Sequence, residues 1–178
     1  MLKNIGEILL DQQAIQGKVA ELAALLDEEY SGKRPLVICV LKGALMFVAD
    51  LTRAMTIPLE IDFMAVSSYG ISTKSSGVVR ILKDLETSIE GRHVLIAEDI
   101  IDTGLTLNYL VENLKSRKPA SLKVCTLLDK PTRRKVDFRP DYCGVTIEDK
   151  FVVGYGLDFA EEYRNLPFIG VLKPEAYE

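Results

Sequence analysis

The sequence is poor in residues that build metal and redox centres: it has one histidine, three cysteines and no tryptophan among 178 residues. Cys39, Cys125 and Cys143 are widely spaced and form no Cys-x-x-Cys pair, so they do not match a zinc or dithiol motif. Free thiols in a reducing compartment are the simplest explanation, and they predict a cytoplasmic protein. The histidine, His93, precedes a buried apolar run, and we interpret it as structural.

Positive charge and long apolar runs are lacking as well. The net charge of −4 provides no basic field that would attract nucleic acid, so we expect no nucleic-acid partner. The N-terminus has no apolar signal region, and no apolar run approaches the length of a membrane span, so we expect no membrane association. At this length the chain can bury the core of one compact domain.

Strand and helix patterns alternate along most of the chain. Apolar residues at helical spacing predict helices over residues 11–30, 44–55 and 104–117. Apolar or alternating runs predict strands over residues 36–41, 59–66, 78–83, 94–97 and 121–128. This rhythm is typical of an α/β fold with a central, mostly parallel sheet flanked by helices.

The C-terminal part has a different pattern. Short strand candidates near 144–147, 151–153 and 168–172 surround an acidic and aromatic segment. We expect them to fold back as a small cap over the carboxyl edge of the sheet. The prediction is a single domain over residues 1–178, with a core over about 34–130 and a C-terminal cap over about 140–178.

The most informative stretch is residues 94–107. An apolar run ends at two adjacent carboxylates, Glu98 and Asp99, and the short segment Asp102-Thr103-Gly104-Leu105-Thr106 then enters a helical pattern. A loop of this kind, at the end of a central strand and the start of a helix, favours phosphate binding. Taken alone, Asp102 or Thr103 would be an ordinary helix cap.

These residues resemble the phosphoribosyl pyrophosphate (PRPP) signature of the type I phosphoribosyltransferases: two acidic residues followed by D-[ST]-G-x-T. Residues 149–158, Asp-Lys-Phe-Val-Val-Gly-Tyr-Gly-Leu-Asp, are similar to the C-terminal signature of the hypoxanthine-guanine branch. The resemblance implies the type I phosphoribosyltransferase fold, with a hood built from the C-terminal segment and the N-terminus. It also implies a homodimer or homotetramer.

The reaction implied by this resemblance is purine salvage: hypoxanthine and/or guanine react with PRPP to give IMP or GMP and pyrophosphate, with Mg²⁺ as cofactor. Asp102 would be the general base or acid at purine N7. Glu98 and Asp99 would bind the ribose hydroxyls, directly or through magnesium-bound water. The expected phosphate cradle consists of Thr103, Gly104, Leu105, Thr106 and Leu107.

Further residues match the family motifs for pyrophosphate. Lys42 and Gly43 follow a predicted strand, and the family has a pyrophosphate loop there, with a cis peptide bond before the lysine. Arg164 matches an arginine that contacts pyrophosphate. Ser68 and Tyr69 match the start of a catalytic lid, although the residues that follow do not resemble its known versions.

The purine would be bound by four residues. The resemblance implies that Lys130 donates a hydrogen bond to the 6-oxo group, since a lysine offers donors and no acceptor. Phe151 would stack on the base, and the backbone of Val152 would contact the base edge. Asp158 would lie beside a second magnesium ion and the exocyclic edge of guanine.

The charged residues and the function allow other interpretations. We interpret Arg133-Arg134-Lys135 as a solvated charged face. A PRPP-sensing regulator that binds RNA could use the same fold, but the acidic net charge and the complete purine set argue against it. A phospho-acceptor signalling domain also has acidic residues and a lysine at strand ends, but it needs neither of the two signatures.

Overall fold

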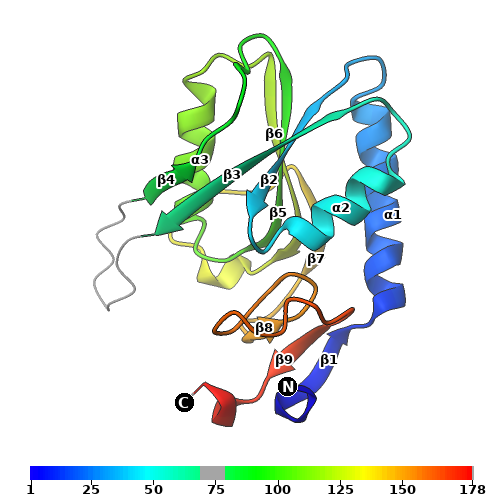
Figure 1. The fold of residues 1–178 in the computed structure, drawn as a ribbon, viewed down its shortest axis with the longest axis vertical. Coiled ribbons are helices and arrows are strands. Elements are labelled where there is room, and N and C mark those ends of the chain that lie inside the picture. Colours follow the sequence, from blue (N-terminus) through cyan, green and yellow to red (C-terminus); the bar gives the residue numbers. More distant parts are fainter. Residues whose placement is uncertain (69–78, 178) are drawn as a thin grey trace.

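The computed structural model describes residues 1–68 and 79–177, and its largest unit is a six-stranded sheet (Figure 1). The strand order is β4-β3-β2-β5-β6-β7, with β4 antiparallel to β3 and the other neighbours parallel. The strands are β2 (Leu36–Leu41), β3 (Glu60–Ser68), β4 (Val79–Lys83), β5 (His93–Ile101), β6 (Ser121–Asp129) and β7 (Tyr142–Thr146). The predicted mostly parallel sheet is confirmed.

Helices cover both faces of this sheet. α1 (Gln12–Glu29) and α2 (Leu45–Ala54) pack on one face, and α3 (Leu105–Lys115) packs on the other. Each face of the sheet has its own hydrophobic core. Val37 and Cys39 of β2 belong to the core under α1 and α2, and Ile38 and Val40 belong to the core under α3. Strands buried on both faces are continuous apolar runs, which explains the pattern in the sequence. None of the helices in the described parts of the chain is both long and apolar enough to cross a bilayer.

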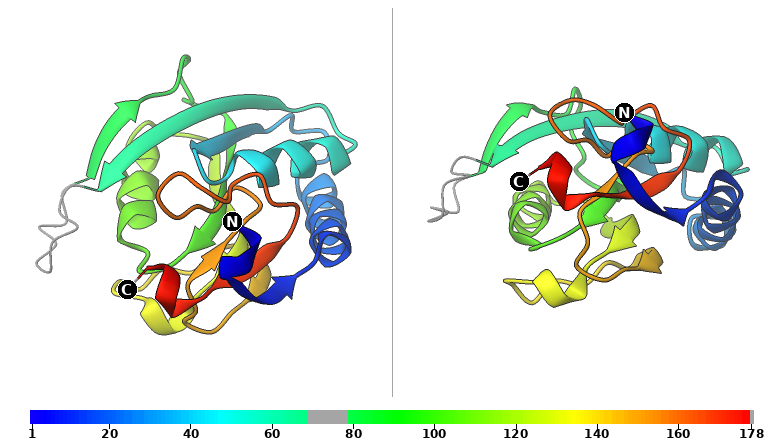
Figure 2. Two further views of the ribbon diagram at one scale, coloured as in Figure 1. Left: turned by 60° about the horizontal axis from the view of Figure 1, so that its bottom comes forward. Right: turned by 90° about the horizontal axis from the view of Figure 1, so that it is seen from below.

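The two ends of the chain form a second, three-stranded sheet, which we call the hood. It contains β1 (Ile5–Leu10), β9 (Ile169–Leu172) and β8 (Val152–Val153), paired antiparallel in that order. Figures 1 and 2 show the hood at the end of the central sheet toward which β2 runs, with both termini in it. A hydrogen bond from Tyr155 Oη to Asp50 Oδ2 (2.6 Å) joins the hood side to α2.

The predicted boundaries of core and cap need correction. Residues 142–146, assigned to the cap of about 140–178, pair with β6 as the edge strand of the central sheet. Helix α1 lies outside the predicted core of about 34–130 but packs directly on that sheet. β5 also extends through Glu98 and Asp99, which were expected to follow the strand. A local pattern predicts that a strand exists, whereas the sheet it joins is decided by long-range packing.

Candidate active site

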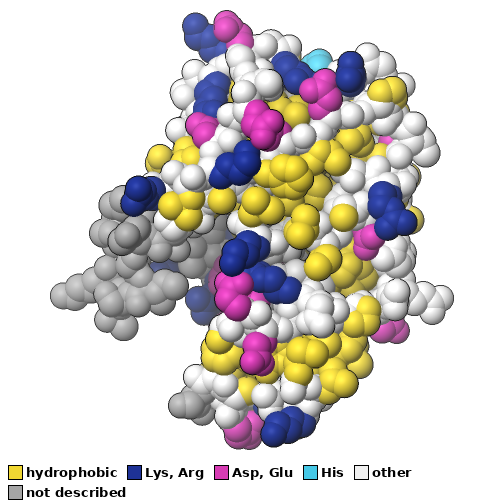
Figure 3. Space-filling model, in the orientation of Figure 1, with side chains coloured by type: hydrophobic (Ala, Val, Ile, Leu, Met, Phe, Trp, Pro, Cys, Tyr) yellow, Lys and Arg dark blue, Asp and Glu magenta, His cyan; other side chains and the backbone are white. Residues whose placement is uncertain are grey.

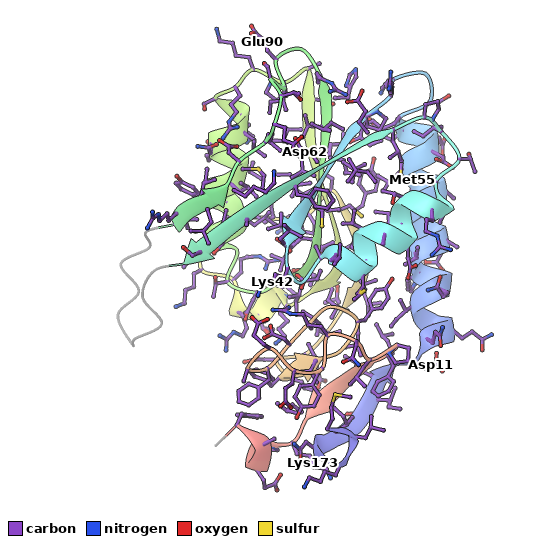
Figure 4. All side chains as sticks on the ribbon, viewed as in Figure 1. Asp11, Lys42, Met55, Asp62, Glu90 and Lys173 are labelled. Carbon is purple, nitrogen blue, oxygen red and sulfur yellow. The ribbon has the colours of Figure 1, made fainter. Side chains whose placement is uncertain are left out.

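Three loops meet at one edge of the central sheet, facing the hood. Lys42 follows β2, Asp102 follows β5, and Lys130 follows β6. Because these three strands are parallel, their carboxyl ends lie at the same edge, which is where open α/β sheets bind ligands. Figure 4 places Lys42 between the sheet and the hood, and Figure 3 shows charged side chains of both signs at this junction.

A small cavity lies at the start of α3. It has a volume of about 150 Å³ and is lined by Glu98, by Thr103 of the loop that enters the helix, and by Thr106 and the buried Leu107 of the first helical turn. The N-cap residue, Gly104, is left-handed (φ 79°) and has no side chain that could cap the helix. The N–H of Leu105 makes one long hydrogen bond to Thr103 Oγ1 (3.4 Å). The other N–H groups of the first turn are available to an anion, and their dipoles favour one. Four of the five predicted phosphate-cradle residues line this cavity, and Leu105 does not.

Two adjacent carboxyl groups, those of Glu98 and Asp99 in β5, lie beside this cavity. Glu98 and Asp99 are adjacent and partly buried, and the backbone N–H of Asp99 donates to Glu98 Oε1 (3.2 Å). Burial raises the pKa of Glu98 well above its usual range, and the charge of Asp99 raises it further. Burial also raises the pKa of Asp99. A cation or hydroxyl donors placed beside this pair would stabilise its ionised form.

This pKa shift predicts that Glu98→Gln stabilises the ligand-free protein at neutral pH. A carboxyl whose pKa is higher in the folded than in the unfolded state binds its proton more tightly when folded. The free energy of unfolding therefore decreases as pH rises from the unfolded-state pKa of this carboxyl to its raised folded-state pKa. Above the raised pKa the full destabilisation by the buried charge is present. We expect Glu98→Gln to be more stable than the native protein at pH 8, and this difference to vanish near pH 4.

Urea unfolding of metal-free protein between pH 4 and pH 8 measures this difference. Glu90→Gln is the matched control, because Glu90 is exposed and lies at the end of the molecule opposite the hood (Figure 4). It should change stability little at any pH. A Glu98→Gln protein that is less stable than the native one at pH 8 would contradict the pKa assignment.

The loop after β2 is packed tightly against the acidic pair. The Leu41-Lys42 peptide bond is cis, as the resemblance implies. A Cβ atom on Gly43 would overlap Asp99 Oδ2 and lie 2.9 Å from Asp99 Cγ, and a Cβ on Gly156 would overlap the carbonyl oxygen of Gly43. Gly43 thus has the backbone of Gly156 on one side and the Asp99 carboxylate on another. Lys42 Nζ lies 3.1 Å from Glu161 Oε2.

Arg164 approaches the same loop from the C-terminal segment. Its Nη1 donates to the carbonyl oxygen of Gly156 (2.7 Å), and its Nη2 lies 3.0 Å from Asp158 Oδ1. The Nε of Arg164 is buried and has no hydrogen-bond partner among the described residues. An unpaired buried guanidinium N–H is suited to an anionic ligand.

A second cavity, of about 440 Å³, lies on the other side of Asp102. Lys130, Phe151 and Val152 line it, together with Ile100, Arg133, Asp149, Leu157 and Tyr177. Lys130 is only 7% exposed, and its Nζ donates to the carbonyl oxygen of Lys150 (2.6 Å). Phe151 is 40% exposed, which leaves ring surface free for a flat ligand.

Asp102 lies between the two cavities and lines both of them. Asp102 is therefore shared by the region suited to phosphate and the region that contains Lys130 and Phe151. A ligand that filled both cavities would place its central part against Asp102.

The interpretation of residues 133–135 as a solvated charged face is wrong for Arg134, whereas Arg133 and Lys135 are exposed. Arg133 Nε lies 2.7 Å from Asp102 Oδ1, and Arg134 Nη1 donates to the Asp102 carbonyl oxygen (2.6 Å). Arg134 also pairs with Asp129, and both of these side chains are nearly buried. Asp102 lies on another loop and Asp129 ends β6, so a run of three basic residues could not reveal these contacts.

Tyr177 is a second residue that the sequence analysis missed. Its ring stacks on Phe151, with centroids 5.0 Å apart and planes at 22°, and Phe159 meets Phe151 edge-on at 5.7 Å. An aromatic residue near the end of a chain gives no local signal for such a contact.

The donor set at the site is compatible with magnesium. The described residues contain no group of three or more histidine, cysteine, aspartate or glutamate side chains that could hold a metal. Magnesium is commonly bound through one or two carboxylates with ligand oxygens and water, and Glu98 and Asp99 provide such a pair. Asp158 pairs with Arg164 and is not clustered with them. Of the predicted lid residues, Ser68 ends β3, and Tyr69 lies outside the described residues.

Comparisons with known proteins agree with this arrangement. Residues 6–160 match the phosphoribosyl transferase domain family. The chain is 59% identical to the hypoxanthine-guanine phosphoribosyltransferase of Bacillus subtilis, over 100% of this chain and 99% of that one. It is 52% identical to the hypoxanthine-guanine-xanthine phosphoribosyltransferase of Tritrichomonas foetus, over 99% and 97% of the two chains.

A solved structure extends this similarity to three dimensions. A hypoxanthine phosphoribosyltransferase from Staphylococcus aureus superimposes with a TM-score of 0.97 at 52% identity, covering 100% of this chain and 97% of that one. The family match spans most of the chain, and both relatives are aligned over nearly their full lengths. The chain belongs to the phosphoribosyltransferase family, in its hypoxanthine-guanine branch.

Proposed function

We propose that this enzyme transfers the 5-phosphoribosyl group of PRPP to hypoxanthine and guanine, releasing pyrophosphate. The observation that carries the proposal is the position of Asp102 between a phosphate-sized cavity and a cavity containing Lys130 and Phe151. A purine in the larger cavity and a ribose 5-phosphate in the smaller one would bring N9 and carbon 1′ together beside Asp102.

In the proposed reaction N9 of the purine attacks carbon 1′ while the bond from carbon 1′ to pyrophosphate breaks. The bonding electron pair leaves with pyrophosphate, and the proton on N7 passes to the Asp102 carboxylate. In the reverse direction protonated Asp102 returns that proton. A positioned acid or base of this kind contributes about 10²- to 10⁴-fold to rate.

The charged and polar groups of the site are complementary to the charges of the reactants. The first-turn N–H groups of α3 and the hydroxyls of Thr103 and Thr106 would hold the 5′-phosphate, and Arg164 and the Lys42 loop would hold pyrophosphate. Glu98 and Asp99 would bind the ribose hydroxyls and favour positive charge at carbon 1′. Mg²⁺, bound at these carboxylates through water and ligand oxygens, would neutralise pyrophosphate; Asp158 is proposed as the contact to a second ion.

Lys130 is proposed to select 6-oxopurines. Its ammonium group is buried and already donates to one carbonyl, and a further N–H can donate to a keto oxygen but not to the amino group of adenine. Phe151 would stack on the base, the backbone of Val152 would contact its edge, and Asp158 would lie near the exocyclic amino group of guanine. This polar selection predicts strong rejection of adenine.

Steady-state kinetics with PRPP and Mg²⁺ on hypoxanthine, guanine, xanthine and adenine test the proposal. We expect turnover of hypoxanthine and guanine and none of adenine. Lys130→Met, which keeps the apolar stem but removes the donors, should lower kcat/KM for both substrates by about 10- to 100-fold. Lys135→Met, on the same loop, is the control and should retain activity.

Equal use of adenine and hypoxanthine would contradict the role of Lys130. Folded protein that binds PRPP but turns over none of the four purines would contradict the proposed reaction, and salt-sensitive RNA binding would then be tested.

We also propose a cytoplasmic location and a homodimer or homotetramer. The three cysteines are free thiols in the structure. Leu45 and Met46 of α2 and Ile61 of β3 are exposed apolar side chains, and Figure 3 shows apolar surface over this side of the molecule.

A further inference from the structure

Arg133 makes the one side-chain hydrogen bond to the Asp102 carboxylate that the described residues provide. Its Nε lies 2.7 Å from Asp102 Oδ1, and its Nη1 lies 3.4 Å from Asp149 Oδ2. Asp102 belongs to the loop after β5, and Asp149 belongs to the loop before β8. Arg133 therefore connects the loop that enters the phosphate cavity with the loop that leads to Phe151.

We propose that Arg133 is a positioning residue, which fixes the Asp102 carboxylate so that its Oδ2 oxygen can accept the N7 proton of the purine. This inference rests on the proposed function. No role in the reaction follows for Arg133 from the sequence signatures, because it lies outside both of them.

The geometry gives the two carboxylate oxygens of Asp102 different roles. The guanidinium Nε–H is rigidly oriented and occupies Oδ1, so Oδ2 is left as the acceptor. The side chain of Asp102 is 42% exposed, and without a partner it could adopt several rotamers. Arg134 Nη1 holds the backbone carbonyl of the same residue. Two consecutive arginines thus fix the main chain and the side chain of Asp102.

Charge complementarity extends from this pair to the purine-binding lysine. The charge of Asp102 raises the pKa of Arg133, so Arg133 remains a cation throughout the working range. Asp149 lies between Arg133 and Lys130, with its Oδ1 3.8 Å from Lys130 Nζ. Asp102, Arg133, Asp149 and Lys130 are therefore a chain of alternating charges along one wall of the 440 Å³ cavity.

This ion pair is half exposed, and such pairs contribute little to folding stability. Its removal should instead affect the reaction, because a small displacement of a catalytic group can reduce rate about 100-fold. Arg133→Ala should therefore fold normally, lower kcat by about 10- to 100-fold, and leave KM for PRPP within about threefold of the native value.

A double-mutant cycle with Asp102→Asn distinguishes positioning from an independent role. If Arg133 acts through Asp102, adding Arg133→Ala to the Asp102→Asn protein should reduce turnover by less than about threefold further. Added guanidinium ion should restore part of the kcat of Arg133→Ala and none of that of Asp102→Asn. Arg139→Ala is the matched control: Arg139 is on the same segment and makes no hydrogen bond or ion pair with any residue in 1–68 or 79–177.

Native-like kcat of Arg133→Ala, or equal losses in the native and Asp102→Asn backgrounds, would overturn the inference. An increase in KM for PRPP with unchanged kcat would also overturn it, since it would indicate a role in binding. These results require an active native enzyme, whereas failure of the proposed function would appear as an inactive native enzyme.

Discussion

Asp102→Asn should reduce turnover of hypoxanthine by about 10²- to 10⁴-fold while the protein still binds IMP. Asparagine keeps the size of the side chain and an oxygen that can accept from Arg133, but it cannot take the N7 proton. The groups proposed to hold phosphate and the 6-oxo oxygen are unchanged by this substitution. The loss should therefore appear in kcat, because it removes an interaction of the transition state.

An ultraviolet assay measures turnover, and calorimetry measures IMP binding, since a chain without tryptophan offers no intrinsic indole signal. Asp137→Asn is the control, because Asp137 is exposed and forms no ion pair within the described parts of the chain. Turnover of Asp102→Asn within about threefold of the native enzyme would show that the base is a different group.

Gly43→Ala should reduce kcat/KM by at least about 100-fold, because a displacement of about 1 Å at a reacting site has effects of this size. The added methyl group would overlap Asp99 Oδ2, so either the carboxylate or the loop after β2 must move. The loop has little freedom to retreat, since the Gly156 backbone packs against the Gly43 carbonyl. Both the proposed ribose contact and the proposed pyrophosphate contact would be disturbed.

Gly17→Ala provides the matched control for Gly43→Ala. Gly17 lies within α1, and a Cβ there would meet no atom within 4 Å. Replacing a helical glycine by alanine should increase the free energy of unfolding by about 0.5–1 kcal/mol. Activity should be unchanged. Native kcat/KM in Gly43→Ala, with PRPP binding retained, would contradict the close packing of Gly43 against Asp99.

The central sheet could be predicted because its signals are local. Val94 to Ala97 are fully buried between α1 and α2 on one face and α3 on the other, so their strand is a continuous apolar run. The Asp102 loop could also be predicted from a local signal, because its carboxylate, hydroxyls and glycine lie within five consecutive residues. Local patterns predicted β7 as a strand but assigned it to the cap, because nothing in Tyr142–Thr146 specifies pairing with β6.

The remaining parts of the site depend on contacts between distant segments. Arg133 and Asp102 are 31 positions apart, and they meet because β5 and β6 are adjacent parallel strands whose following loops share one edge. Tyr177 reaches Phe151 because β9 pairs with β8 and returns the C-terminus to the second cavity. Such pairs follow from topology, and they can be inferred from the sequence only after the sheet order is known.

The most direct measurement is product analysis by mass spectrometry after the native enzyme is incubated with PRPP, Mg²⁺ and equal concentrations of hypoxanthine and adenine. The proposed reaction should give IMP and pyrophosphate in equal amounts, with no AMP above the enzyme-free control. AMP in amounts comparable to IMP, or free ribose phosphate and pyrophosphate without any nucleotide, would contradict it.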